Sequence, residues 1–305
     1  MPTIATMMMT QTTVVSNDSS KYKVDKRCVV CQLKSFERLL AKFKATDGQH
    51  QQFVEFYNLT MVRVASNTMA QIHRELNNEF CRILMVSDPY EQEKMECNLL
   101  ALELYKDYKV KVQKSDHPFE MALRLSIAGN IMDYGASSQF EVESTIRKVL
   151  ESNFAINHSA ELKKRLNTAK KVLYLGDNAG EIVFDKLYIE TIQHPQITFT
   201  VRGANVLNDV TIEDAKQVGM DKVVTVIDNG YDAPSTILSK CSTEFLDIYK
   251  QADLIISKGQ GNFEGLIDEN DARIFFLLMV KCDVVAERLQ VEKGSFVVYN
   301  QQGNR

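Results

Sequence analysis

The sequence predicts an α/β protein, in which an N-terminal helical region precedes a C-terminal region built on a mostly parallel sheet. Between residues 26 and 166, apolar side chains recur at helical spacing. After residue 170, short β-branched apolar runs alternate with helical patterns, which is typical of parallel strands with helices on both faces. We therefore expect a flexible tail over residues 1–24, a helical region over 25–168 and an α/β region over 169–305.

Five segments of the helical region carry apolar residues near helical spacing: SFERLLAKF, QFVEFYNLTMVRVA, NLLALELYKDY, EMALRLSIAGNIMDYG and FEVESTIRKVLES. Pro89 and Pro118 fall between helices, where helix breakers are expected. Six runs of the α/β region predict strands: KVLYLG, ITFTVR, KVVTVI, ADLIIS, RIFFLLMV and SFVVYN. The intervening EIVFDKLYIETI, VTIEDAKQVG and CDVVAERLQV predict helices.

Composition limits the classes of function. The formal net charge is -4, and acidic and basic residues are interspersed, so no basic patch for nucleic acid stands out. No run approaches the roughly 20 apolar residues that a membrane span needs. The first twenty residues are polar and lack the pattern of a signal peptide. We expect a cytoplasmic protein with reduced thiols and without nucleic-acid or membrane partners, and the oligomeric state is left open.

Polar side chains follow three of the predicted strands. Asp177, Asn178 and Glu181 follow the first, Asp209 follows the second, and Lys258 follows the fourth. Ligands of parallel α/β sheets bind beyond the carboxyl ends of the strands, so these residues can share one crevice. Two carboxylates and an amide carbonyl suit Mg²⁺ or Mn²⁺. The alternative is that Asp177, Asn178 and Asp209 only form turns and cap the following helices.

The ends of two strands also carry basic side chains. Lys258 ends the fourth strand within SKGQGNFEGL, where it can neutralise a phosphate, and Asn262, which follows it, is a further candidate for substrate binding. Arg202 ends the second strand and can hold another phosphate oxygen, or it is only a surface charge. The sequence contains no GxxxxGK[ST] loop, GxSxG elbow or HExxH helix, so serine hydrolase and metalloprotease mechanisms have no support.

A CVVC motif lies near the start of the chain. Cys28 and Cys31 lie one helical turn apart, which supplies half of a zinc site. Cys282, in KCDVVAERL, is a candidate third ligand of a structural Zn²⁺. The alternative for each of these cysteines is a small buried apolar side chain.

Taken together, the motifs resemble one family. CVVC, DPYEQEKMECN, GNIMDYG, GDNAGEIVFDKL, RGANVLNDVT, ADLIISKGQGNFE and KCDVVAERL occur in this order in the metal-dependent damage-control phosphatases, long labelled a domain of unknown function. The resemblance runs from about Cys28 to the C-terminus, and the CxxC element is similar to that of the short prokaryote-like branch.

The resemblance implies a Rossmann-like α/β part and one divalent metal, Mg²⁺, Mn²⁺, Co²⁺ or Ni²⁺, held by Asp177, Asn178 and Asp209. It also implies that Lys258 contacts phosphate. Asn130 and Asp133, in GNIMDYG, match a motif near the same cleft and are candidates for substrate binding. The sequence departs from the family pattern at Pro234-Ser235, where a proline-glycine pair is expected.

We therefore expect a phosphatase that hydrolyses small phosphorylated metabolites, such as sugar phosphates or damaged cofactor precursors. The candidate catalytic residues are Asp177, Lys258 and Glu181, with Asp177 or Glu181 as the base. Two alternatives remain. One is a carboxyl methyltransferase that uses S-adenosylmethionine, and the other is a non-enzymatic module that binds a metal or ligand.

Overall fold

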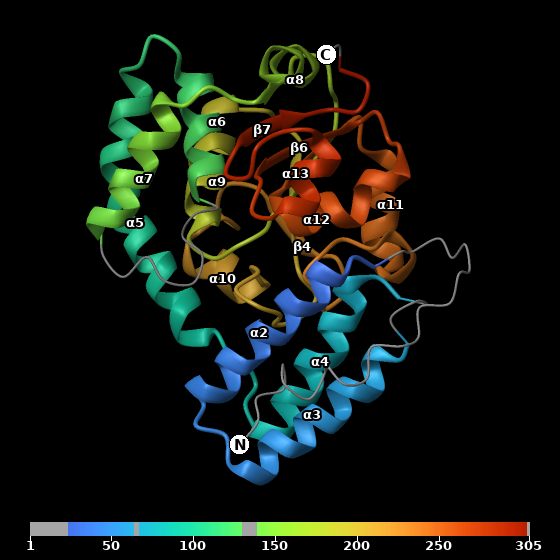
Figure 1. Ribbon diagram of the computed structural model, residues 1–305. Helices are drawn as coiled ribbons and strands as arrows, with labels where there is room; N and C mark the ends of the chain where they lie inside the picture. Colours follow the sequence, from blue (N-terminus) through green and yellow to red (C-terminus); the bar gives the residue numbers. More distant parts are fainter. Residues whose placement is uncertain (1–23, 64–66, 130–138, 304–305) are drawn as a thin grey trace. The chain divides into compact units, whose positions relative to one another are not determined.

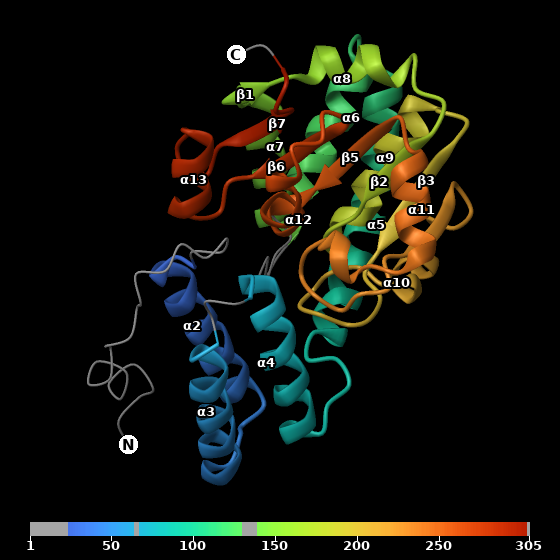
Figure 2. The same cartoon turned by 90° about the vertical axis from the view of Figure 1, so that its right-hand side faces the viewer.

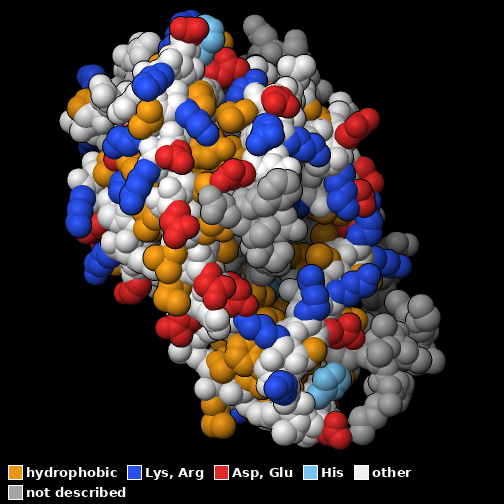
Figure 3. Space-filling model, turned by 90° about the vertical axis from the view of Figure 1, so that its left-hand side faces the viewer, with side chains coloured by type: hydrophobic (Ala, Val, Ile, Leu, Met, Phe, Trp, Pro, Cys, Tyr) orange, Lys and Arg blue, Asp and Glu red, His pale blue; other side chains and the backbone are white. Residues whose placement is uncertain are grey.

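The computed structural model describes residues 24–63, 67–129 and 139–303 (Figure 1). These residues form two compact units, one ending at Pro89 and the other beginning at Tyr90. Among the described residues, no helix combines the length and the apolar character that crossing a bilayer requires. On the face of the molecule in Figure 3, basic and acidic side chains are interspersed.

The first unit contains three described helices, α2 (Lys26–Lys42), α3 (Asp47–Met61) and α4 (Met69–Leu84). Capping boxes start the last two of these helices. Thr46 and Gln49 exchange side-chain and backbone hydrogen bonds at the start of α3, and Thr68 and Gln71 do so at the start of α4. Such boxes satisfy backbone N–H groups that the first turn of a helix leaves unpaired, so they fix where both helices begin.

Aromatic side chains form the centre of this unit. The ring of Phe36, from α2, lies 5.0 Å from that of Phe53 in α3 and 6.0 Å from that of Phe80 in α4. The three side chains are at most 1% exposed. The imidazole of His73 packs on Phe36 at 5.2 Å between ring centroids, so a titratable group lies inside this core.

The second unit is built on a seven-stranded sheet in the order β1-β7-β6-β5-β2-β3-β4. Its strands are β1 (Ile156–Asn157), β2 (Val172–Leu175), β3 (Ile197–Val201), β4 (Thr225–Asp228), β5 (Leu254–Lys258), β6 (Ile274–Met279) and β7 (Phe296–Tyr299). All neighbouring pairs are parallel except β6 and β7. The six predicted strands are present, and the two-residue edge strand β1 is an addition.

Helices cover both faces of this sheet (Figures 1 and 2). They are α5 (Glu91–Gln113), α6 (Pro118–Ala128), α7 (Gln139–Glu151), α8 (Ser159–Leu166), α9 (Glu181–Ile192), α10 (Ile212–Gln217), α11 (Thr243–Gln251), α12 (Gly259–Leu266) and α13 (Asp283–Leu289). Successive side chains of a strand point to opposite faces. Accordingly, Val172 and Tyr174 of β2 join the core under α5–α10, whereas Leu173 and Leu175 join the core under α11–α13.

The strand order confirms the predicted α/β class and its Rossmann-like form. The segment β4-β3-β2-β5-β6-β7 has the doubly wound order, in which the chain turns from one half of the sheet to the other between β2 and β5. The boundary expected after residue 168 falls inside the second unit. Its helices α5 and α6 pack against α9, and therefore belong to the core of the sheet.

Candidate active site

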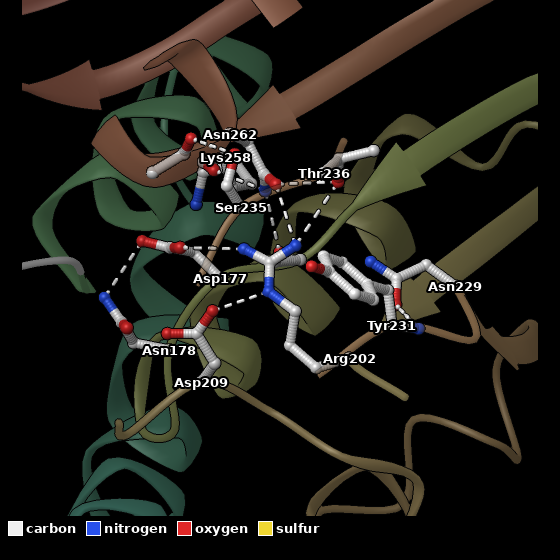
Figure 4. A network of polar contacts seen from close by, with 12 residues as sticks. Asp177, Asn178, Arg202, Asp209, Asn229, Tyr231, Ser235, Thr236, Lys258 and Asn262 are labelled. Carbon is white, nitrogen blue, oxygen red and sulfur yellow. Dashed lines mark hydrogen bonds and ion pairs between the residues drawn. The ribbon is translucent and has the colours of Figure 1, made fainter. Parts of the chain in front are cut away.

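The candidate site lies beyond the carboxyl ends of the central strands. Asp177 and Asn178 follow β2, Arg202 follows β3 and Lys258 ends β5 (Figure 4). Because β2 and β5 are neighbours at the point where the strand order reverses, their ends border the crevice in which doubly wound folds bind ligands. The sequence prediction that these strand ends converge is correct.

Two loops carry the predicted metal ligands, and their backbones are joined. Asn178 and Asp209 form an isolated antiparallel bridge. Val210 N donates to Asp177 O at 2.8 Å, and Ala179 N donates to Asn208 O at 2.9 Å. These bonds bring Asp177 and Asn178, after β2, beside Asp209, after β3. Asn178 also donates its Nδ2 to Asp177 Oδ2 at 3.0 Å.

The alternative reading of these side chains as helix caps is wrong. The residue that precedes α9 is Gly180, and none of the described side chains of the preceding loop caps that helix end. Thr211 is the N-cap residue of α10, and its backbone N and Oγ1 both donate to Asp214 Oδ2, at 2.9 and 2.8 Å. Capping therefore does not account for polar side chains at Asp177, Asn178 and Asp209, which are each at most 6% exposed.

Arg202 lies between the two carboxylates. Its Nε donates to Asp209 Oδ2 at 2.5 Å, and its Nη2 lies 3.6 Å from Asp177 Oδ1. Nη2 has no hydrogen-bond partner among the described residues, although it is buried. The alternative of a surface charge is wrong, because Arg202 is only 3% exposed. The guanidinium balances negative charge from both carboxylates and keeps one buried donor without an acceptor.

Asn262 supports this guanidinium. Its Oδ1 accepts from Arg202 Nη1 and from Thr236 Oγ1, each at 2.8 Å. Its Nδ2 donates to Gly176 O at 3.0 Å and to Lys258 O at 2.9 Å. The Asn262 amide, predicted to bind substrate, is thus engaged within the protein and fixes the orientation of Arg202.

Lys258 is completely buried among acceptors. Its Nζ donates to Asp185 Oδ1 at 2.6 Å, to Ser126 O at 2.8 Å and to the carboxylate of Glu181. Tyr174 OH also donates to Asp185 Oδ1, at 2.7 Å. The three N–H groups of the ammonium are therefore matched by three acceptors from α6 and α9.

Charge explains the proton affinities in this cluster. Burial by itself lowers the pKa of Lys258, but the charges of Asp185 and Glu181 outweigh it and raise this pKa above its ordinary value. Burial raises the pKa of the Asp185 carboxyl, because one ammonium does not fully compensate two carboxylates that are excluded from water. Lys258 is consequently charged at neutral pH.

A glycine allows Asp177 to lie against the start of α12. Gly259 has a φ of +76°, and a Cβ built on it would lie 1.8 Å from Asp177 Oδ2. Only glycine gives the backbone both this left-handed conformation and room for the carboxylate. Asp177 is therefore bordered by Arg202 on one side and by the backbone of Gly259 on another.

Several supporting residues were not among those predicted from sequence. Asp185 lies one turn after Glu181 on α9, and an acid within the apolar pattern EIVFDKLYIETI was a usable signal. Lys94 and Asn98 of α5 contact the same loops from a helix far earlier in the chain. Only the motif DPYEQEKMECN, part of the family resemblance, contained them.

The predicted site residues also include Asn130, Asp133 and three cysteines. Asn130 and Asp133 lie outside the described residues. Cys28 and Cys31 lie in α2 of the first unit, and Cys282 precedes α13 in the second unit, where its Sγ lies 3.3 Å from Gln260 Nε2. A structural zinc shared by the three cysteines stays a prediction.

The candidate metal ligands are of mixed chemical type. In the described part of the chain, no three His, Cys, Asp or Glu side chains are grouped so that they could hold a metal ion. The predicted set contains two carboxylates, of Asp177 and Asp209, and its third member is the amide of Asn178. Metal binding here would therefore rely on an amide oxygen as well as on carboxylates.

The fold and the site define a Rossmann-like α/β protein whose carboxylate, amide and guanidinium groups gather at the switch point of the sheet. Residues 10–297 match the family described as the damage-control phosphatase ARMT1-like domain. The chain belongs to this family, and the resemblance inferred from its motifs is confirmed.

Archaeal relatives are similar over most of their length. The protein MJ0202 of Methanocaldococcus jannaschii, which is named as uncharacterized, is 34% identical over 90% of this chain and 95% of its own. Damage-control phosphatase PH1575 of Pyrococcus horikoshii is 32% identical over 90% of this chain and 97% of its own. A damage-control phosphatase of Archaeoglobus fulgidus is 35% identical over 77% and 82%.

A solved structure shares the fold. The crystal structure of the DUF89 family protein PH1575 from Pyrococcus horikoshii superposes with a TM-score of 0.82 at 30% identity. The alignment covers 92% of this chain and all of that chain. The arrangement of helices and strands described above is therefore that of the family.

Proposed function

We propose that the protein is a divalent-metal-dependent phosphatase that hydrolyses small phosphorylated metabolites, such as sugar phosphates or damaged cofactor precursors. Relatives at 32% and 35% identity are named damage-control phosphatases, which supports a phosphatase. The convergence of Asp177, Asn178 and Asp209 beside Arg202 carries the proposal, because it combines oxygen ligands for a cation with a donor for phosphate in one buried place.

The donor set fits a hard divalent cation. Asp177 and Asp209 supply carboxylate oxygens, and Asn178 turns its Nδ2 to Asp177, so its carbonyl oxygen is the amide atom that can coordinate. Among the described residues, Arg202 sets one positive charge against the two negative charges of these acids, so a divalent cation can add to the positive charge there. When bound, Mg²⁺, Mn²⁺, Co²⁺ or Ni²⁺ would supply that charge and polarise a phosphoryl oxygen.

Arg202 is the candidate group for binding phosphate. Its Nη2 is buried, points toward Asp177 and lacks a hydrogen-bond acceptor among the described residues. A phosphate oxygen would satisfy this donor, and charge-assisted bonds of this kind are stronger than neutral ones. Asn262 and Asp209 hold the other two nitrogens, so the guanidinium is fixed before the substrate arrives.

Glu181 is the candidate base. If Asp177 coordinates the cation, it does not accept a proton, which leaves Glu181 as the other acid that follows β2. Lys258 fixes the orientation of the Glu181 carboxylate. We assign to Glu181 the acceptance of a proton from the attacking water. For a direct phosphate contact, Lys258 would exchange one of its three acceptors for a phosphate oxygen.

Phosphate release after metal removal tests the proposal. The protein is treated with a chelator, and Mg²⁺, Mn²⁺, Co²⁺ or Ni²⁺ is then added back in assays of sugar phosphates and an aryl phosphate. We expect activity that requires an added metal and falls about 100-fold or more in Asp209→Ala, because this variant loses a ligand of the cation that would stabilise the transition-state charge.

A matched control removes an exposed carboxylate. Asp247, in α11, pairs with Lys250 and its side chain is 60% exposed. Asp247→Ala should keep wild-type activity. Folded wild-type protein that releases no phosphate with any metal would contradict the proposal and favour the methyltransferase or the non-enzymatic module. Calorimetric binding of S-adenosylmethionine would then separate these two alternatives.

A further inference from the structure

We propose that Lys94 and Asn98 are positioning residues, which fix the two loops that carry the candidate metal ligands in a single arrangement. The proposal rests on the proposed function and adds a role for α5. Both residues lie in the first half of α5, four positions apart, and therefore on the same face of the helix. They are at most 5% exposed, although both are strongly polar.

Asn98 holds the loop after β2. Its Oδ1 accepts from Gly180 N at 2.7 Å. Gly180 has a φ of +77°, directly precedes α9, and comes two residues after Asn178. No side chain of the loop itself caps α9, so Asn98 supplies the acceptor for the backbone at that position.

Asn98 also reaches the second loop. Its Nδ2 donates to Gln217 Oε1 at 2.8 Å and lies 3.4 Å from Asp214 Oδ1, both in α10. Asp214 holds the start of α10 by accepting from Thr211, two residues after Asp209. The Asn98 amide thus connects Gly180, in the loop after β2, with α10, the helix that follows the loop after β3.

Lys94 holds the second loop at two points. Its Nζ pairs with Asp214 Oδ2 at 3.1 Å and donates to Asn205 Oδ1 at 3.2 Å. Asn205 lies in the loop between Arg202 and Asp209. Lys94 therefore connects the middle of the loop with its end at α10, which restricts where Asp209 can lie.

Loss of the Lys94 and Asn98 contacts should weaken metal affinity more than it lowers stability. The backbone bonds between Asp177 and Val210, and between Ala179 and Asn208, already join the loops to each other. Lys94 and Asn98 fix these two joined loops against α5, a helix that belongs to the core of the sheet. Mutation of residues that orient metal ligands without contacting the metal typically weakens metal affinity by about 10- to 100-fold. A residue that is only part of the core would lower stability and leave the affinity of the folded protein unchanged.

The experiment measures Mn²⁺ affinity directly. Isothermal titration calorimetry of the full chain gives the Kd for Mn²⁺ of wild type, Asn98→Ala, Lys94→Met and Lys94→Arg, and thermal unfolding confirms that each variant is folded. We expect Kd to rise about tenfold or more in Asn98→Ala and Lys94→Met. Lys94→Arg keeps the charge and should recover most of the affinity. In the phosphatase assay, kcat should fall at saturating metal while KM changes less.

Leu104→Ala is the matched control. Leu104 lies on the same helix, is 3% exposed and packs in the core of the sheet. This variant should unfold at a lower temperature and keep the wild-type Kd. If Lys94→Met does not fold, Asn205→Ala replaces it, because Asn205 is half-buried and its substitution removes one partner of Lys94.

Three results would overturn the inference, each in a different way. A Kd in folded Asn98→Ala and Lys94→Met within twofold of wild type would show that α5 does not position the ligands, and would leave the proposed function intact. A Kd that rises equally in Leu104→Ala would assign the effect to general loosening of the core. Wild-type protein that binds no Mn²⁺ would instead refute the proposed metal site together with the role of α5.

Discussion

Arg202 Nε donates to Asp209 Oδ2 at 2.5 Å, and both residues are only 3% exposed. The same guanidinium bonds Asn262 with Nη1 and faces Asp177 with Nη2. One planar group therefore connects the loops after β2 and β3 with helix α12. A lysine ammonium is a point charge on a flexible side chain, so it cannot make all three of these contacts at once.

Arg202→Lys should consequently behave as a severe substitution. We expect kcat/KM for metal-dependent phosphate release to fall about 100-fold or more, because the charge remains but the fixed donors do not. Steady-state assays measure the change. Arg288→Lys is the control, since Arg288 forms an exposed pair with Asp268 and should retain full activity. Activity of Arg202→Lys within threefold of wild type would refute the assigned role.

Gly259→Ala tests the contact between Asp177 and the start of α12. The new methyl group would lie 1.8 Å from Asp177 Oδ2, so the carboxylate must move. We expect a large loss of activity and a weaker Kd for Mn²⁺. Gly294→Ala is a matched control, because Gly294 also has a positive φ, of +87°, and a Cβ added there would meet no atom within 4 Å.

The two glycine variants separate strain from displacement. Both place alanine in the left-handed region, which costs about 1–2 kcal/mol of stability. Only Gly259→Ala moves a site residue. Chemical denaturation and phosphate release, measured on both proteins, should therefore show the cost of backbone strain alone in Gly294→Ala, and a larger loss of stability together with a loss of activity in Gly259→Ala. Equal activity in the two variants would mean that the position of Asp177 is not critical.

Much of this fold was predictable because its strands are continuous apolar runs. VLYL and LIIS are covered on both faces, which requires apolar residues at nearly every position, and such runs stand out in sequence. The rule that ligands bind beyond the strand ends then brought Asp177, Asn178 and Asp209 together. The sequence alone does not show whether these residues bind a ligand or cap a helix, because the same residue types do both. In the structure the N-cap residues of α9 and α10 are Gly180 and Thr211.

The partners of Lys258 were not predictable. Which way its ammonium turns depends on how α9 packs against β2 and β5, and that packing sets Glu181 and Asp185 in front of it. The contact of Asn98 with Gly180 spans 82 positions of sequence and depends on the same packing. The two-residue strand β1 has no periodicity to detect, because its pairing with β7 alone defines it.

Lys258→Met should destabilise the second unit strongly. The variant leaves Glu181 and Asp185 buried without their counter-ion, and breaking a buried pair in this way costs about 3–5 kcal/mol. Urea denaturation followed by circular dichroism measures the loss. The triple variant Lys258→Met, Glu181→Gln, Asp185→Asn removes all three charges, and it should recover a large part of the stability.

A surface lysine provides the comparison for this variant. Lys250 has a side chain that is 72% exposed and pairs with Asp247, so Lys250→Met should change stability by less than about 1 kcal/mol. A triple variant no more stable than Lys258→Met would indicate that hydrogen-bond geometry, rather than charge, holds the cluster together. Loss of activity in the triple variant is expected, because Glu181 is the candidate base.

His73 gives the first unit a pH-dependent stability. Burial lowers the pKa of its imidazole from 6.5 to about 4, so the folded protein keeps it neutral. The unfolded chain binds the proton at higher pH than the folded one does, and stability therefore rises with pH between about 4 and 6.5. The stabilisation is complete above the unfolded pKa and is lost as pH falls through this window.

Acidification to pH 5 should therefore reduce the stability of the first unit by about 2 kcal/mol through His73 alone. Urea denaturation at pH 7 and pH 5 measures the change, and hydrogen exchange of amides in α2 and α4 shows which unit opens. His73→Gln, which cannot titrate, should lack this part of the pH dependence. Gln32 Nε2 and His73 Nδ1 lie 2.6 Å apart, so the substitution also tests a buried polar contact. An unchanged pH dependence in the variant would mean that other groups cause it.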